Sequence, residues 1–136
     1  MTTRRTALAA FAALVLAPAL ALAHAAPGAR GPHGGPMMDL GPYHAELVAK
    51  DGELTLHLFD TADRPIRLPG AAATAIVLAE GRQQNVTFTP RSDETSMVAT
   101  GDFRAAPGMR VVVQLVPAPG QPRVQARFSP ADAAAR

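Results

Sequence analysis

The sequence predicts an all-β protein: a single immunoglobulin-like Greek-key β-sandwich of about seven short strands, with a small barrel as the alternative. Three observations predict this class. From residue 43 onward, apolar and polar residues alternate with a period of two. Turn signals rich in Gly, Pro and Asp separate the alternating segments at short intervals. No segment after residue 25 shows the period of an amphipathic helix.

The strongest local signal is the hairpin predicted around Asp51-Gly52, which joins strands over residues 43–50 and 53–60. Asp-Gly between alternating segments favours a two-residue turn, because both residues tolerate a positive φ. Such a turn fixes the register and places Glu46 opposite His57. One face of the hairpin is expected to join the core and collects Ala45, Leu47, Ala49, Leu54, Leu56 and Leu58. The other face collects His44, Glu46, Val48, Thr55, His57 and Phe59.

The rest of the domain is expected to form short strands separated by turns. A short extended piece at residues 66–68 precedes a hairpin around Glu80-Gly81. The alanine content of residues 71–79 would suit a helix, but Thr74, Ile76 and Val77 favour a strand in its second half. The remaining strands are expected at residues 73–79, 82–89, 95–100, 109–117 and 123–129.

Residues 1–25 have the parts of a secretory signal peptide: paired arginines, an apolar core over residues 7–16 and a small-residue cleavage site. Pro18 interrupts the apolar run, which is too short for the roughly 20 residues of a membrane span. Cleavage is expected after Ala23 or Ala25, with Sec export favoured over the twin-arginine route. We therefore expect a periplasmic protein with no membrane span after cleavage.

Composition excludes several function classes. Without the leader and its two arginines, 11 basic residues stand against 11 acidic ones, so the mature chain is close to neutral. With no basic run, one Tyr and five Phe, nothing indicates nucleic-acid binding. The chain has no cysteine nucleophile, no G-x-S-x-G elbow and no phosphate-binding glycine loop, so an enzyme is not expected. Because cysteine is absent, any soft-metal site must use His and Met.

The segment between the leader and the β-domain is rich in Gly and Pro and is expected to be flexible or lightly docked. It carries His33, Met37 and Met38, and imidazole with thioether prefers Cu(I) or Ag(I). The alternative is a linker whose methionines dock as ordinary apolar side chains. The expected domain boundaries are residues 1–25 for the signal peptide, 26–42 for the arm, 43–130 for the sandwich and 131–136 for a frayed tail.

Three side chains on the polar face of the first hairpin form the other candidate metal site. His44, Glu46 and His57 converge in the predicted register, because opposed residues lie about 5 Å apart at Cβ and diagonal ones about 7 Å. Two imidazoles and a carboxylate suit a zinc or copper ion. The alternative is a solvated sheet face on which Glu46 and His57 form an ordinary cross-strand pair. Carboxylates at turn positions, such as Asp60, Asp63, Asp93 and Glu94, are expected to cap the backbone.

A family resemblance is carried by the run His33-Gly34-Gly35 and by residues 41–48, 51–56, 75–78, 101–103 and 122–128. These motifs resemble the accessory β-domain of periplasmic adaptor subunits of heavy-metal efflux pumps of the resistance-nodulation-division class. They are also similar to small stand-alone exported proteins, some of which are encoded near such pumps. The resemblance covers nearly the whole mature chain and implies a periplasmic sandwich associated with divalent-metal or copper handling, with an efflux-system component as partner. The helical hairpin and lipoyl-like segments of a full adaptor are not seen, so ion binding or buffering is the expected role.

Two functions are therefore expected, in order. The first is a non-catalytic metal-binding or metal-resistance accessory protein for copper- or zinc-type ions. The second is an interaction module of the cell envelope that docks another protein through an edge strand, for which residues 66–68 are the candidate.

Overall fold

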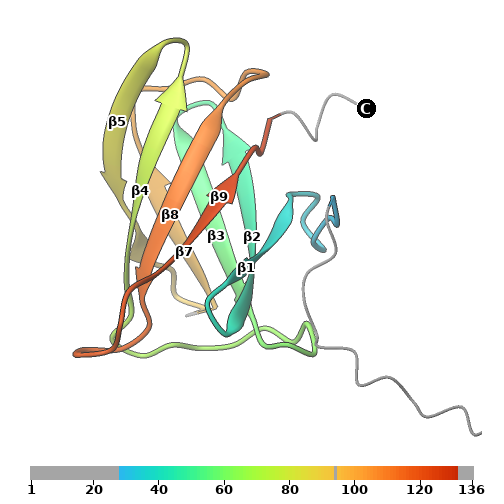
Figure 1. The fold of residues 1–136 in the computed structure, drawn as a ribbon, viewed down its shortest axis with the longest axis vertical. Helices are drawn as coiled ribbons and strands as arrows, with labels where there is room; N and C mark the ends of the chain where they lie inside the picture. The colour runs from blue at the N-terminus through green and yellow to red at the C-terminus, as the bar shows by residue number, and fades with distance from the viewer. Residues whose placement is uncertain (1–27, 94, 132–136) are drawn as a thin grey trace, which may run out of the picture.

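The structure is a computed structural model that describes residues 28–93 and 95–131. The predicted leader, Glu94 and residues 132–136 lie outside the described residues. Within the described ranges the chain forms nine strands and no helix. No helix there is long and apolar enough to cross a membrane. Two antiparallel sheets pack against each other as two layers (Figure 1), which confirms the all-β prediction.

The strands of the two sheets alternate along the chain. The first sheet has the order β1-β2-β3-β7-β6 and contains β1 (Met37–Leu40), β2 (Tyr43–Lys50), β3 (Glu53–Phe59), β6 (Thr89–Pro90) and β7 (Ser96–Thr100). The second has the order β5-β4-β8-β9 and contains β4 (Ala72–Ala79), β5 (Arg82–Thr87), β8 (Arg110–Val116) and β9 (Val124–Phe128). The chain changes sheet after β3, after β5 and after β7. Consecutive groups of strands (β1–β3, β4–β5, β6–β7 and β8–β9) therefore belong to the two layers in turn (Figure 1).

The register predicted for the first hairpin is confirmed. Lys50 pairs with Glu53 across the Asp51-Gly52 turn, and Glu46 pairs with His57. On the core face, fully buried leucines alternate with the residues of the outer face. Fully buried apolar residues of this core face include Leu47, Leu54 and Leu56, and β8 contributes Val111, Val113 and Leu115 from the facing sheet.

β4 shows the same alternation of buried and exposed residues, which confirms a strand rather than a helix for residues 72–79. The sequence predicts one strand over residues 82–89, but the structure has two strands there, β5 in the second sheet and β6 in the first. Phe88 is buried between β5 and β6 because the chain changes sheet at that residue.

Residues 66–68 are not an edge strand, so that prediction is wrong. Prolines bound the segment on both sides, and a proline has no N–H to donate to a ladder. An isolated bridge joins Phe59 to Pro65 just before the segment, and the Ile66 N–H bonds to the Leu58 carbonyl at 3.1 Å, but residues 66–68 form no strand. The segment instead crosses the end of the sandwich, where Ile66 and Leu68 pack against the core.

The predicted arm contains a strand that the sequence did not indicate. β1 pairs with β2 and lies beside β9 at the side of the sandwich (Figure 1). Leu40 is fully buried in the core, which holds the far end of β1. Residues 31–35 form a tight turn, closed by the bond from Gly31 N–H to the Gly35 carbonyl, and the Leu47 N–H bonds to the Pro36 carbonyl. The described part of the arm therefore lies along the outer side of β2. Ala131, placed by the sequence in the tail, is buried in the core.

Candidate functional site

One row of side chains crosses the outer face of the first sheet. Met37 on β1 is opposite Glu46 on β2, which is opposite His57 on β3, which is opposite Ser96 on β7. Directly opposed residues project from the same face of a sheet. We call these four residues the outer row. His33, from the arm, covers two members of this row, Glu46 and His57.

Glu46 is the centre of this site. Its side chain is fully buried, and its Oε2 accepts the backbone N–H of His33 at 2.9 Å and that of Gly35 at 2.8 Å. Its Oε1 lies 2.8 Å from His33 Nδ1. A Cβ on Gly31 would overlap the Glu46 carboxyl carbon, so only glycine lets the arm approach this closely. The arm thus forms a concavity of N–H donors around a buried carboxylate, which compensates the cost of burying it.

The bond to Glu46 sets the tautomer of His33. A carboxylate can only accept, so Nδ1 carries the proton and donates it. In the neutral ring Nε2 then keeps its lone pair. The side chain of His33 is 49% exposed, so this face of the ring can be reached from solvent. A histidine whose other ring nitrogen donates to a carboxylate is the usual arrangement of a metal ligand.

His57 completes a pair of imidazoles. Its ring stacks on that of His33, with centroids 3.6 Å apart and planes within 4°. Burial lowers the pKa of His57 below its usual 6.5, and the neighbouring His33 lowers it further, whereas Glu46 acts in the opposite direction. The ring is therefore neutral at neutral pH, which is the form that binds metal ions.

A pocket of about 150 Å³ opens beside the two rings; its lining residues are His33, His57, Leu58, Phe59, Pro65, Asp93 and Thr95. Asp93 Oδ1 accepts the backbone N–H of Thr95 at 3.0 Å and of Ser96 at 3.1 Å. The predicted capping role of Asp93 is confirmed, as is that of Asp60, which accepts the backbone N–H groups of Ala62 and Arg64. Sequence reasoning did not connect Asp93 with the histidines, because 36 positions separate it from His57 and no local pattern joins them.

The structure places His44 in a different cluster from the other predicted ligands. Its Nδ1 lies 2.7 Å from Asp63 Oδ1, and its Nε2 lies 3.4 Å from Asp39 Oδ1. Both ring nitrogens therefore face carboxylates, and the His44 side chain is buried. Asp63 was expected to cap a turn but instead binds this ring. His44 ties β2 to β1 and to the loop after β3.

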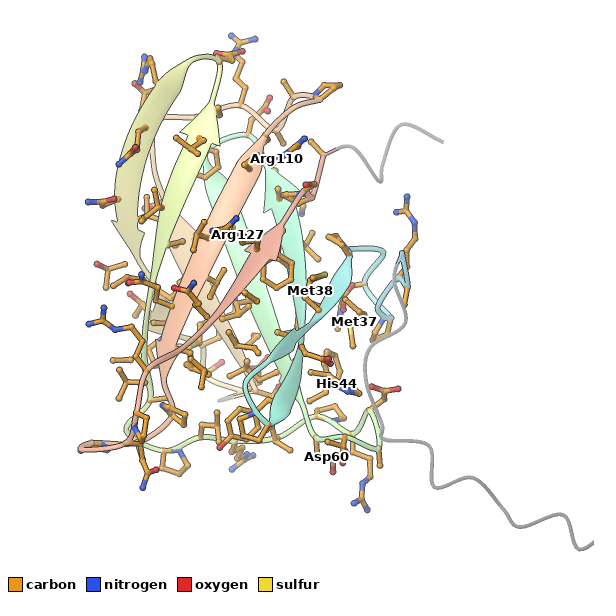
Figure 2. All side chains as sticks on the ribbon, viewed as in Figure 1. Met37, Met38, His44, Asp60, Arg110 and Arg127 are labelled. Carbon is orange, nitrogen blue, oxygen red and sulfur yellow. The ribbon has the colours of Figure 1, made fainter. Side chains whose placement is uncertain are left out.

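The two methionines of the arm project from opposite sides of β1. Met37 is buried in the outer row opposite Glu46, whereas Met38 is opposite Ala45 and 38% exposed (Figure 2). Successive residues of a strand point to opposite faces, so the two thioethers do not share one site: Met37 lies on the face that His33 covers, and Met38 on the other.

Of the predicted ligands, the structure thus brings His33, Glu46 and His57 together and leaves His44 and Met38 apart. Within residues 28–93 and 95–131, no group of three or more His, Cys, Asp or Glu side chains is arranged to hold a metal ion. No family model, curated protein or solved structure matches the chain.

Proposed function

We propose that this protein is a periplasmic, non-catalytic metal-binding accessory of metal resistance that takes a copper- or zinc-type ion at His33 and His57. The observation that carries the proposal is the contact between His33 Nδ1 and the buried Glu46, made beside the second imidazole. Two imidazoles are a ligand pair that zinc and copper share.

Each residue has a separate role in this proposal. Glu46 orients His33 and keeps Nε2 as the nitrogen that binds the ion. His57 supplies the second nitrogen from β3. The lone pairs of the two stacked rings lie in nearly parallel planes, with ring centroids 3.6 Å apart, so a single ion can lie in the plane of both rings only after one ring tilts. His33 is the ring expected to move, because it lies on the short arm while His57 lies within the sheet.

The cellular setting is part of the same proposal. The leader-like composition of residues 1–25 supports export to the periplasm. The resemblance of its motifs to accessory domains of efflux adaptors is the reason for proposing a component of a heavy-metal efflux system as partner. The strand order β2-β3-β7-β6 facing β5-β4-β8-β9 supports the immunoglobulin-like Greek-key sandwich, with β1 as an added strand.

Calorimetric titration of the exported protein with Zn²⁺, Cu²⁺ and Cu⁺ tests the proposal. We expect one ion per chain, and a large loss of affinity in His33→Ala and in His57→Ala. His44→Gln is the matched control, because this histidine has carboxylate partners outside the site. The absence of heat with all three ions would overturn the proposal. The competing function, docking through an edge strand, instead predicts that the histidine substitutions leave partner binding unchanged.

A further inference from the structure

The pocket beside the histidines has one more donor, and it defines the class of ion. Among the described residues, no three such side chains are arranged as a metal site while the two rings are stacked. We infer that, once the His33 ring has tilted out of the stack, Asp93 acts as the third ligand, so that the site takes a divalent borderline ion, Zn²⁺ or Cu²⁺, on two imidazoles and one carboxylate, without a thioether. This inference rests on the proposed function and adds the third ligand and the ion class.

Asp93 is held at the pocket that the two imidazole rings line. It lines the same pocket as His33 and His57, and its charge acts on His57. Ser96, the residue directly opposite His57 in the outer row, donates its hydroxyl to Asp93 at 3.0 Å from Oδ2 and 3.1 Å from Oδ1. The carboxylate is therefore fixed by the strand neighbour of His57.

The hydrogen bonds of Asp93 leave one oxygen with capacity for an ion. Among the described residues, Oδ1 accepts two backbone N–H groups in addition to the Ser96 hydroxyl, whereas Oδ2 accepts that hydroxyl alone. A carboxylate oxygen has about two lone-pair sites, so Oδ2 keeps one for coordination. The ordered turn means that little side-chain freedom would be lost on binding.

The other carboxylate of the site is a poor ligand. Glu46 already accepts three N–H bonds and lies beneath the arm backbone at Gly31. Coordination by Glu46 would break the bonds that orient His33. Glu46 therefore remains the partner of His33, and Asp93 remains available to the ion.

The thioethers are also badly placed. Met37 lies on β1, two strands from His57, and neighbouring strands are about 4.8 Å apart, so roughly 10 Å separates the two backbones. Met38 projects from the opposite face. A site of two nitrogens and one anionic oxygen suits Zn²⁺ or Cu²⁺ better than Cu⁺, which prefers sulfur.

One cationic group also stands near the site. The Arg91 guanidinium lowers the pKa of His57, though less than burial and His33 do. Arg91 lies 3.5 Å from Glu53 Oε1, so part of its charge is compensated there. The positive charge of Arg91 that remains disfavours a cation at this position, and the negative charge of Asp93 acts against it.

The test compares Asp93→Asn with a matched variant, Asp60→Asn. Both residues cap a turn through two backbone N–H groups, but only Asp93 lines the pocket. We expect Asp93→Asn to weaken Zn²⁺ binding at least ~10-fold and to change the visible absorption of bound Co²⁺. Asp60→Asn and Met37→Leu should bind Zn²⁺ as the wild type does. If Asp93→Asn does not fold, Asp93→Ser replaces it, because a serine hydroxyl can still cap the turn.

The outcomes separate the inference from the proposed function. If Asp93→Asn binds Zn²⁺ as the wild type does while His57→Ala does not, Asp93 is not a ligand and the proposed function stands. If Met37→Leu removes binding, or if Cu⁺ displaces Zn²⁺ at equal concentration, thioether ligation replaces the inference. If the wild-type protein binds none of the ions, both the inference and the proposed function fail.

Discussion

The imidazole rings of His33 and His57 stack in parallel, with centroids 3.6 Å apart. One ring comes from the arm and the other from β3, so the stack is a direct contact between the arm and the first sheet. The same His33 ring also meets Glu46 through Nδ1. The arm is thus fastened at two adjacent points, and a change at either point should alter both its position and the availability of the rings.

Removal of the charge on Glu46 should loosen the arm. Glu46→Gln is expected to lower the free energy of unfolding by about 1–3 kcal/mol, because an amide NH₂ would face one of the N–H donors of His33 or Gly35 and leave it unsatisfied. Urea denaturation measures the loss. Glu53→Gln is the control: its carboxylate is 38% exposed and its pairing with Arg91 should contribute less than ~1 kcal/mol. Equal losses in the two variants would contradict this role for Glu46.

Glycine should be required at position 31 only because a larger side chain does not fit against Glu46. In Gly31→Ala the new Cβ would overlap the Glu46 carboxyl group, so we expect the arm to move away from Glu46 and its hydrogen bonds to that carboxylate to break. Hydrogen exchange of the Gly35 amide, which bonds to Glu46, reports this directly. Gly34→Ala is the comparison, because Gly34 has open space around it but a φ of 84°, which costs an alanine roughly 1–2 kcal/mol. Faster exchange is expected in Gly31→Ala than in Gly34→Ala, and the reverse order would show that backbone strain matters more than the close approach.

His44 should matter for stability and not for ion affinity. His44→Gln is expected to lower the free energy of unfolding by about 1–3 kcal/mol, because the buried ring links Asp39 and Asp63. Thermal melting gives the loss, and Zn²⁺ titration of the same sample gives the affinity. A variant that melts like the wild type yet binds Zn²⁺ weakly would return His44 to the ligand set.

The stability of the ion-free protein should fall as the pH falls below neutrality. The folded-state pKa of His57 is below its usual 6.5, mainly because of burial, so the unfolded chain takes up this proton first. The contribution of His57 is therefore complete above about pH 6.5 and is lost as the pH falls through the lower folded value.

Urea denaturation from about pH 8 to about pH 5 should show this decline, and His57→Asn should make it shallower. Asp60 should contribute to stability over a second, more acidic pH range. A backbone hydrogen bond from Arg64 lowers its pKa below the usual 3.8, so its contribution is lost only in more acidic solution. Identical slopes for the wild type and His57→Asn between pH 8 and 5 would contradict the assignment to His57.

The first hairpin could be predicted from sequence to the residue, because the Asp51-Gly52 turn and the alternation of Leu47, Leu54 and Leu56 agree on one register. Both signals are local. β1 was missed for the opposite reason: four residues between Pro36 and Gly41 are too few for a periodic signal, and the strand forms because it can pair with β2. The division at Phe88 was missed because one buried residue there is compatible with one strand or two.

The candidate site could be predicted only in part. The pairing of Glu46 with His57 follows from the hairpin. The docking of His33 on Glu46 spans 13 positions and depends on the arm turning back, which composition alone does not show. The glycines at positions 31 and 35 were read as a sign of flexibility, whereas each lies where a Cβ would collide with β2. Glycine in a linker can indicate close approach as well as freedom.

Glu46 holds the arm with hydrogen bonds and not with a disulfide. The chain contains no cysteine, so reductants and oxidants have no thiol to act on. A covalent link would give the arm one permanent position. Hydrogen bonds can open and re-form within the lifetime of a single molecule, so a link of this kind lets the described part of the arm leave Glu46 and return to it without any covalent step.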